Sequence, residues 1–415
     1  MSFGLLGEHL SHSYSQIIHN MIGAYSYDMY EVAPEDLEDF IENGDFSGLN
    51  VTMPYKETVM PLIQVDPLAK KLGAVNTIYH KDGVLRCTNT DFFGFMYLLS
   101  LNKIDLTNKK VLILGTGGAS KIVQATAHAC EAKDVFVASR QKSKQYVSYK
   151  TLPLDVDIIV NATPVGTYPN ITERIVDLKP FTKLEAVIDL NYNPSKSDLL
   201  LQAEKRGIKF ANGLSMLVAQ ATKAGQYFVG MDFLQYNKQI LRNLEAMTLN
   251  IIIVGMPSSG KTTIGTAVAK LTDRKFVDLD EEVVKRAGMP IPEIFDKYGE
   301  KHFRDLETEV IKDFGKEKNL VIATGGGTII REENRDAIRC NSVVVELKRD
   351  FSLLSTDGRP VSQAAESMDA LYNERKEFYD LAKDVSVENN DTVENVANKV
   401  LDKIGDYYEN EDFNK

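Results

Sequence analysis

Residues 249–262 read LNIIIVGMPSSGKT, and they decide the fold of the C-terminal part of the chain. An apolar strand leads into a loop that satisfies GxxxxGK[ST], and a helix-like stretch follows, which is the context this pattern requires. In such a loop the backbone N–H groups surround nucleotide phosphates, the lysine neutralises the outer phosphates, and the next hydroxyl binds Mg²⁺. We therefore expect ATP to be bound by Ser258, Ser259, Gly260, Lys261, Thr262 and Thr263.

Strand-like and helix-like segments alternate on both sides of this loop, which predicts an α/β chain with parallel sheets covered by helices on both faces. The strands expected upstream are 2–6, 27–32, 48–52, 110–114, 134–138, 157–160 and 186–190. A length of 415 residues exceeds what one hydrophobic core usually supports. The domains we predict are an α/β substrate domain at 1–104 completed by about 213–240, a Rossmann-like domain at 105–212, a flexible linker at 241–247 within the polar helical segment KQILRNLEAM, and a P-loop domain at 248–415.

Composition and charge exclude several classes of function. The formal net charge of −11 argues against nucleic acid or an anionic membrane as a partner, because proteins that bind polyanions carry excess Lys and Arg. Export signals and runs of about 18 apolar residues are absent from the sequence, so a cytoplasmic protein without a membrane span is expected. Cys87, Cys130 and Cys340 are widely spaced, which fits reduced thiols better than disulfides or a zinc site.

A second glycine-rich loop follows the apolar stretch KVLIL at 110–114. Glycines allow a phosphate to approach the backbone N–H groups at a helix N-terminus, where a β-carbon would block it. The spacing is GxGG instead of the full GxGxxG, so an ordinary strand–turn–helix loop is the competing interpretation. If the loop binds a dinucleotide, its contacts come from Gly115, Gly117, Gly118 and Ala119.

The next strand, DVFVA at 134–138, ends in Ser139 and Arg140. In NAD-specific sites an acidic residue here binds the ribose hydroxyls, whereas an arginine can pair with the 2′-phosphate of NADP. We therefore expect NADP(H) as the cofactor of this domain. A solvent-exposed loop arginine is the alternative interpretation of Arg140.

Two polar turns in the first domain offer a lysine and a carboxylate. Hydride transfer to a carbonyl needs a group that exchanges the hydroxyl proton, often a lysine held near an opposite charge. The segment NVTMPYK at 50–56 places Lys56 just after a strand, and TNTD at 88–91 supplies Asp91. Taken singly, a lysine in such a position is more often solvent-exposed than catalytic, so this pair is a candidate that needs support from the rest of the chain.

Over residues 1–240 the chain resembles the shikimate dehydrogenase family. The resemblance rests on eight ordered elements, which are HSYS with HN within 12–20, NVTMPYK, GAVNT at 73–77, NTD at 89–91, GTGGA at 115–119, NATPVG at 161–166, DLNYNP at 189–194, and Gly213 with Met216, Leu217 and Gln220. It implies that Lys56 transfers the proton and that Asp91 holds the substrate hydroxyl near it. The substrate contacts it implies are Ser13, Ser15, Thr52, Asn76, Asp91, Tyr192 and Gln220.

The same resemblance places the NATPVG turn beside the nicotinamide. It adds Ser139, Arg140, Thr163 and Gly213 to the NADP contacts. Gln16, the segment GEHL at 7–10 and Ser139 depart from the family pattern, and none of them belongs to the expected proton-transfer pair.

Several polar and small residues follow the GKT loop. Asp278 and Asp280 end the next strand, where one carboxylate can organise Mg²⁺ together with Thr262 and the other can accept a hydrogen bond from a substrate hydroxyl. The triplet at 325–327 is three glycines, which leave room for a small ligand against the backbone. Arg304 and Arg375 can bind a carboxylate, although a pair of ordinary helix-surface arginines close to glutamates is the alternative.

Over residues 248–415 the chain resembles shikimate kinase. By this resemblance Asp280 holds the acceptor hydroxyl, and Arg304 and Arg375 pair with the shikimate carboxylate through their forked guanidinium groups. Gly325, Gly326 and Gly327 line the pocket, and Arg359 belongs to a lid over ATP. A second arginine shortly before Arg359 is missing, which is the largest departure from the family pattern.

Both halves of the chain thus predict the same metabolite. The function expected is NADPH-dependent reduction of 3-dehydroshikimate followed by MgATP-dependent phosphorylation of shikimate, two steps of aromatic amino acid biosynthesis. The alternatives are a nucleotide-binding regulator with a degenerate dehydrogenase domain, and a quinate/shikimate dehydrogenase with an inactive kinase domain. The regulator predicts the loss of Lys56, Asp91, Lys261 or Asp280, and the sequence retains all four.

Overall fold

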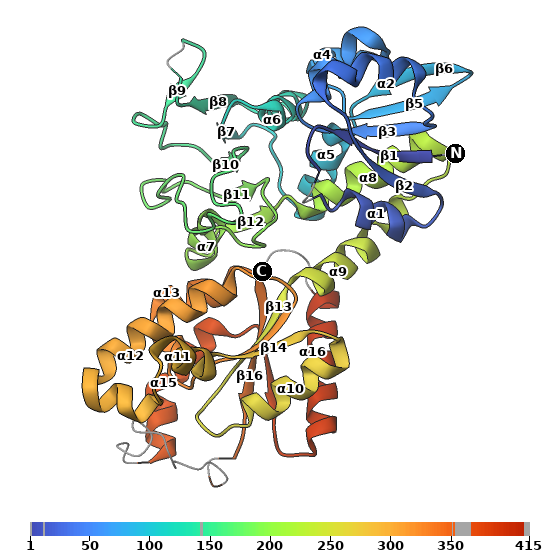
Figure 1. Cartoon of the computed structure of the whole chain (residues 1–415). Coiled ribbons are helices and arrows are strands. Elements are labelled where there is room, and N and C mark those ends of the chain that lie inside the picture. The colour runs from blue at the N-terminus through green and yellow to red at the C-terminus, as the bar shows by residue number, and fades with distance from the viewer. Residues whose placement is uncertain (1, 11–12, 142–143, 351, 353–366, 411–415) are drawn as a thin grey trace.

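The computed structural model describes residues 2–10, 13–141, 144–350, 352 and 367–410, and within these ranges the chain forms three β-sheets. Figure 1 shows the first two sheets in one half of the molecule and the third in the other half. Each sheet is covered by helices, which confirms the α/β class. None of the described helices is long and apolar enough to cross a membrane.

The first sheet has the strand order β2-β1-β3-β5-β6-β4. Its strands are β1 (Ser2–Gly7), β2 (Ser26–Glu31), β3 (Gly48–Val51), β4 (Gln64–Val65), β5 (Thr77–Lys81) and β6 (Val84–Thr88). Its helices are α1 (Ser15–Ile22), α2 (Leu37–Asn43), α3 (Tyr55–Thr58), α4 (Pro67–Leu72) and α5 (Asp91–Leu101), with 3₁₀ turns η1 (Pro34–Asp36) and η2 (Met60–Leu62).

The expectation of purely parallel sheets is wrong for β5 and β6. These strands pair antiparallel with each other, and β5 also pairs antiparallel with β3. Asp82 and Gly83 connect them with φ values of 54° and 74°. Asp-Gly favours a two-residue hairpin turn because both positions then need positive φ, so the sheet is mixed.

The second sheet is parallel throughout, in the order β12-β11-β10-β7-β8-β9. Its strands are β7 (Lys110–Leu114), β8 (Asp134–Ser139), β9 (Val147–Ser148), β10 (Ile158–Asn161), β11 (Ala186–Asp189) and β12 (Lys209–Asn212), with helices α6 (Gly118–Ala129) and α7 (Asp198–Lys205). Because the strand order reverses at β7, the carboxyl ends of β7 and β10 form the position where open α/β sheets bind ligands.

The third sheet has the order β14-β15-β13-β16-β17, also parallel. Its strands are β13 (Asn250–Val254), β14 (Lys275–Asp278), β15 (Leu320–Ala323), β16 (Ser342–Lys348) and β17 (Val385–Glu388). Its helices are α10 (Lys261–Thr272), α11 (Leu279–Ala287), α12 (Ile291–Gly315), α13 (Glu332–Arg339), α15 (Met368–Ala382) and α16 (Val393–Asn410), with the turn η4 (Thr328–Ile330).

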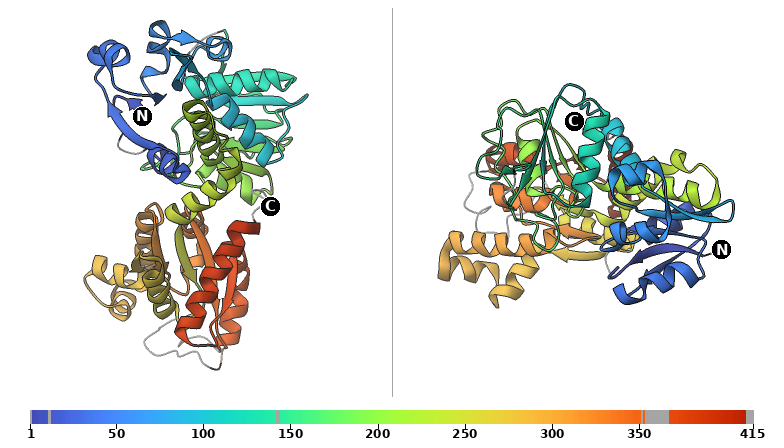
Figure 2. Two further views of the ribbon diagram at one scale, coloured as in Figure 1. Left: turned by 90° about the vertical axis from the view of Figure 1, so that its right-hand side faces the viewer. Right: turned by 90° about the horizontal axis from the view of Figure 1, so that it is seen from above.

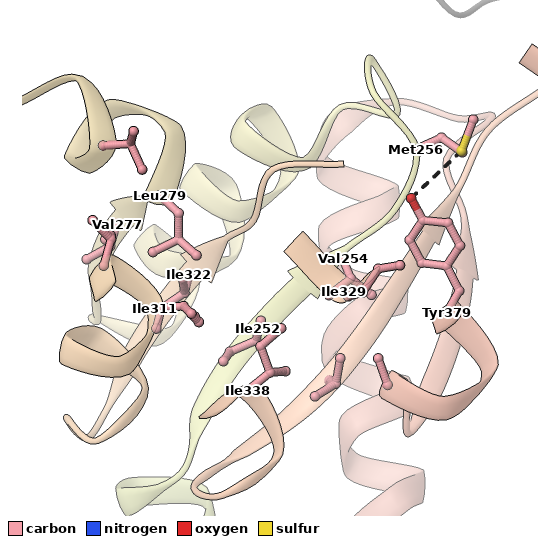
Figure 3. Close-up of a cluster of buried hydrophobic side chains, with 14 of the residues drawn as sticks. Ile252, Val254, Met256, Val277, Leu279, Ile311, Ile322, Ile329, Ile338 and Tyr379 are labelled. Carbon is pink, nitrogen blue, oxygen red and sulfur yellow. Dashed lines mark hydrogen bonds between the residues drawn. The ribbon is translucent and has the colours of Figure 1, made fainter. Parts of the chain in front are cut away.

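Two buried clusters hold the helices of the third domain on opposite faces of its sheet. One cluster joins the sheet to α11, α12, α13 and α15, and the other joins it to α10 and α16. Figure 3 shows the first cluster, in which the Tyr379 hydroxyl points at the sulfur of Met256 at 3.7 Å. Met256 belongs to the phosphate loop, so this packing fixes the loop against α15.

The connection between the halves is a packed helix, which corrects the expectation of a flexible linker at 241–247. That segment lies inside α9 (Asn237–Thr248), which follows α8 (Leu214–Val229) and the turn η3 (Leu234–Tyr236). Ile240, Leu241 and Leu244 are buried against α1 and α8. Figure 2 shows α8 and α9 leading from the first half of the molecule to the second. The exact domain boundaries stay a prediction.

Candidate active sites

The lysine and the carboxylate expected in the first domain meet in the structure. Lys56 lies in α3, directly after β3, and Asp91 is the first residue of α5. The Nζ atom of Lys56 donates to Oδ2 of Asp91 at 2.6 Å, and the two side chains are 29% and 15% exposed. The amine is therefore partly exposed and held in place by the carboxylate, an arrangement that suits a proton-transfer group.

A buried amide network lies next to this pair. The side-chain amide of Asn76 donates to the Thr90 hydroxyl at 3.0 Å and to Oε1 of Gln220 at 3.4 Å. Its oxygen accepts the Thr90 backbone N–H at 2.7 Å. Gln220 lies on α8, after the second sheet in sequence, so the chain returns to complete the first domain. Our sequence analysis missed Thr90, although it precedes Asp91 in the TNTD turn.

Ser13, Ser15 and Tyr192 form a second group near the start of α1. The Ser13 hydroxyl accepts the Ser15 backbone N–H at 3.1 Å. Tyr14, between the two serines, contacts the ring of Tyr192 at 5.4 Å between centroids. Helix α1 packs against α8, which carries Gln220. The backbone carbonyl of Thr52 accepts the backbone N–H of Tyr55, the first residue of α3, at 3.0 Å.

The dinucleotide loop lies at the carboxyl end of β7, and α6 begins at Gly118. A β-carbon at Gly115 would lie 2.6 Å from Thr163, whereas one at Gly117 or Gly118 would meet no atom within 4 Å. The last two glycines therefore leave their backbone N–H groups open to an incoming phosphate. Ala119 follows in the first turn of α6. Arg140 is exposed beyond β8, and the Ser139 hydroxyl accepts the Gln141 N–H.

Asp189 is buried at the end of β11 and is a residue that the sequence did not single out. It connects the loops that follow β10 and β11 by hydrogen bonds. Asp189 Oδ1 accepts from the Asn161 side chain at 3.0 Å, and Oδ2 accepts from the Ser197 hydroxyl at 2.5 Å. Burial raises the Asp189 pKa to about 6. Asn161 in turn accepts from the Thr163 hydroxyl at 2.7 Å. A β-carbon at Gly213 would lie 2.0 Å from the Leu190 carbonyl oxygen, so this position requires glycine for close packing.

The phosphate loop has the backbone that its sequence predicts. Gly255, Ser258 and Gly260 have positive φ, and α10 starts at Lys261. Lys261 Nζ donates to the carbonyl oxygens of Gly255 and Met256 at 3.0 and 2.9 Å, so the ammonium group lies over the loop.

The expected metal ligands lie next to this loop. The Thr262 hydroxyl donates to Oδ2 of Asp278 at 2.7 Å. These oxygen donors fit Mg²⁺, which also takes water and phosphate oxygens as ligands. Among the described side chains, no cluster of three or more His, Cys, Asp or Glu groups is arranged to hold a metal. Thr262 and Asp278 thus suit a Mg²⁺ ion that is bound together with a nucleotide.

The expected acceptor site of the third domain is assembled around the glycine triplet. A β-carbon at Gly325 would lie 2.8 Å from Oδ1 of Asp280, and one at Gly327 would lie 2.6 Å from the Arg304 guanidinium. The Arg375 guanidinium donates to the Gly326 carbonyl at 3.1 Å. The space beside these glycines is therefore occupied by the functional side chains, where we had expected the ligand itself.

Neither arginine is an ordinary surface residue. Arg375 is 5% exposed, and the Arg304 side chain is 12% exposed. Arg304 does contact the nearby glutamates, at 3.2 Å to Glu300 and 2.9 Å to Glu307. Glu307 is buried and also accepts from the Thr328 hydroxyl at 2.5 Å, so it fixes the guanidinium. Arg359 lies outside the described residues.

Comparisons with known proteins identify the family that each half of the chain resembles. The sequence model of the shikimate dehydrogenase substrate-binding domain matches residues 5–78, and that of shikimate kinase matches residues 257–405. Shikimate dehydrogenase (NADP(+)) of Caldanaerobacter subterraneus is 36% identical over 260 residues, covering 56% of this chain and 92% of the relative. The Caldicellulosiruptor bescii protein of the same name is 37% identical over 248 residues, covering 53% and 86%.

Solved structures show the same fold for the first half. A chorismate mutase/shikimate 5-dehydrogenase fusion protein from Clostridium acetobutylicum is 33% identical, with a TM-score of 0.56, covering 59% of this chain and 97% of that one. Shikimate 5-dehydrogenase from Thermus thermophilus, solved with NADP(H) and shikimate, is 28% identical, with a TM-score of 0.53, covering 59% and 99%.

Fold and sites together define a two-part enzyme, a dinucleotide-dependent dehydrogenase joined to a P-loop kinase. The chain belongs to the shikimate dehydrogenase family and carries a shikimate kinase domain behind it. The resemblances seen in the sequence are thereby confirmed.

Proposed function

We propose that this chain reduces 3-dehydroshikimate to shikimate with NADPH and then phosphorylates shikimate with MgATP. The observation that supports the proposal is that side chains suited to each reaction lie close together in each half. In the first half these side chains are the Lys56–Asp91 pair, and in the second they are Asp280 with Arg304 and Arg375 beside the phosphate loop. The product of the first reaction is the substrate of the second.

In the reduction, Lys56 and Asp91 act on the oxygen of the substrate carbonyl. NADPH supplies a hydride to the carbonyl carbon when it is bound. Lys56 gives a proton to the oxygen, which becomes the new hydroxyl, and Asp91 holds both the amine and that hydroxyl in line. Asn76, Thr52, Tyr192 and Gln220 bind the remaining hydroxyls, and Ser13 and Ser15 bind the carboxylate.

The choice between NADP(H) and NAD(H) depends on residues at the carboxyl ends of β7 and β8 in the second sheet. Gly117 and Gly118, at the start of α6, would hold the cofactor diphosphate, because the space beside them is open. Arg140 would pair with the 2′-phosphate, since it is an exposed arginine directly after the end of β8. Gly115, Ala119, Ser139, Thr163 and Gly213 shape the rest of this pocket.

In the phosphorylation, Lys261 and the loop N–H groups bind the β- and γ-phosphates of ATP. Thr262 and Asp278 would hold Mg²⁺, and Asp280 accepts a hydrogen bond from the attacking shikimate hydroxyl. Arg304 and Arg375 bind the shikimate carboxylate by charge-assisted hydrogen bonds. The bond from the γ-phosphorus to the bridging oxygen breaks as the bond to the substrate oxygen forms, the hydroxyl proton passes to Asp280, and ADP leaves.

The regulatory alternative is not favoured, because the sequence retains Lys56, Asp91, Lys261 and Asp280, the four residues whose loss it predicts. Since both reactions consume NADPH or ATP, we assign the protein to the cytoplasm. Its partners are then small molecules, and its net charge of −11 disfavours nucleic acid.

The test is product analysis by mass spectrometry. Purified protein is incubated with 3-dehydroshikimate, NADPH and Mg²⁺, with and without ATP. Shikimate is expected without ATP and shikimate 3-phosphate with it. Shikimate in both tubes would show that the kinase half is inactive, and no reduction in either tube would contradict the proposal for the first half.

Gly327→Ala is expected to raise the KM for shikimate in the phosphorylation reaction by about tenfold or more, because the new methyl group displaces the Arg304 guanidinium. The KM for ATP and the reduction reaction should stay unchanged. Gly405→Ala in α16 is the matched control, since a β-carbon there meets no atom within 4 Å. The measurement is the initial rate of phosphorylation at varied shikimate concentrations. An unchanged KM for shikimate in Gly327→Ala would show that Arg304 does not bind the substrate.

A further inference from the structure

A lysine of the kinase domain reaches the dehydrogenase half. Lys318 lies in the turn between α12 and β15, and its Nζ donates to the Tyr14 hydroxyl at 2.5 Å. The same ammonium lies 4.8 Å from the centre of the Tyr14 ring. Among the described residues, Lys318 has no carboxylate at ion-pair distance, which sets it apart from Lys312 and Lys316 on the same side of α12.

Tyr14 is part of the frame of the dehydrogenase substrate site. It precedes α1 and is flanked by Ser13 and Ser15. Its ring contacts Tyr192, and both rings pack, as Leu217 does, against the buried cluster that includes Leu214 and Val218. The Leu217 carbonyl accepts from the side chain of Gln220 at 2.8 Å. A shift of Tyr14 would therefore move groups that we assign to substrate binding.

The loop that carries Tyr192 is anchored to the kinase domain as well. The backbone N–H of Ser195 donates to Oδ1 of Asn341 at 3.2 Å, and that of Lys196 donates to the Cys340 carbonyl at 2.8 Å. The amide nitrogen of Asn341 donates to the Glu317 carbonyl at 3.1 Å. Glu317 directly precedes Lys318. The buried Asn341 therefore connects the loop at 191–196 with the turn that carries Lys318.

A partly buried ion pair joins the two halves. Glu204 of α7 accepts two hydrogen bonds from the Arg339 guanidinium, at 2.7 and 3.1 Å, and one from Lys196 at 2.7 Å. A bidentate arginine–carboxylate contact fixes orientation as well as distance. Figure 1 shows α1 next to α9, at the side of the first half that faces the kinase domain.

We propose that the kinase domain supplies Lys318 as a positioning residue for the dehydrogenase substrate site. Lys318 holds the Tyr14–Tyr192 pair, and through it Ser13, Ser15 and the loop at 191–196, in the geometry that binds 3-dehydroshikimate. This inference rests on the proposed reduction activity. The kinase domain thereby adds to the substrate affinity of the first half, whose reactive side chains all come from the dehydrogenase residues.

The test is Lys318→Met in the full chain, with steady-state kinetics of both reactions. The KM for 3-dehydroshikimate is expected to rise about fivefold, as loss of a partly buried cation–π and hydrogen-bond contact predicts, while kcat changes less than about twofold. The KM for NADPH and the kinase constants stay as in the wild type. Lys318→Arg keeps a donor and a cation at the ring, so it should restore most of the affinity.

Lys316→Met is the matched control, because Lys316 lies two residues away but pairs with Asp313 inside the kinase domain. It should leave the KM for 3-dehydroshikimate unchanged. Tyr14→Phe should raise this KM as Lys318→Met does, and the double variant should be no worse than either single one, as for two residues that act through one contact.

Two results would overturn the inference. The first is an unchanged KM in Lys318→Met, and the second is an equal rise in Lys316→Met or a loss of kinase activity, which would indicate a general effect on folding. Failure of the proposed function looks different, because the wild-type chain itself would then not reduce 3-dehydroshikimate.

Discussion

Lys56→Ala is expected to lower kcat for 3-dehydroshikimate reduction by about 10² to 10⁴-fold, the usual contribution of a positioned proton-transfer group. The amine lies 2.6 Å from Asp91, next to the Asn76, Thr90 and Gln220 network, and the substitution removes the only amine of this ion pair. Phosphorylation of added shikimate should proceed at the wild-type rate, because the kinase site lies in the other half of the chain.

The measurement is NADPH oxidation followed at 3-dehydroshikimate concentrations above and below KM. Lys70→Ala on α4 is a matched control, since Lys70 is an exposed lysine of the same domain. If Lys56→Ala raised only KM and left kcat intact, Lys56 would be a binding residue and the proton would come from another group. If both activities fell together in a folded protein, the two halves would not act as separate sites.

Local sequence patterns predicted those parts of the sites that consist of a single continuous segment of the chain. The strand–loop–helix of 249–262 is complete in itself, because backbone conformation and glycine placement over eight residues produce the phosphate cradle. The expected strands at 110–114 and 134–138 correspond to β7 and β8 within one residue. The β5–β6 hairpin also had a local signal in Asp82-Gly83, which the alternation of strands and helices obscured.

Side chains that act through distant partners left no such signal. Glu307 becomes important only because Thr328, 21 residues further on, and Arg304 converge on it in the fold. Lys318 and Asn341 matter through contacts that depend on how the two halves dock. The sequence did contain a signal that α9 packs against other helices. Ile240, Leu241 and Leu244 are apolar and spaced so that they lie on one face of a helix.

Lys261→Ala is expected to lower kcat for shikimate phosphorylation by about 10²-fold or more, as removal of a preorganised charge from a phosphoryl-transfer site does. The loop itself should keep its shape, because Met256 is anchored by Tyr379 and the Ser259 carbonyl accepts from Asn389. Reduction of 3-dehydroshikimate should be unaffected. ADP release that depends on shikimate is the measurement, with Lys270→Ala, an exposed lysine of the same helix, as the matched control.

The physical basis of this prediction is differential stabilisation. Lys261 reaches two carbonyl oxygens of the loop, at 3.0 and 2.9 Å, and bound ATP offers its β- and γ-oxygens to the same ammonium group. Charge grows on the bridging oxygen as the phosphoryl group leaves, so the lysine stabilises the transition state more than the bound ATP, and kcat falls more than affinity when it is removed. A variant that lost ATP affinity but kept kcat would show that Lys261 only anchors the nucleotide, and catalysis would then depend on Mg²⁺ at Thr262 and Asp278 and on Asp280.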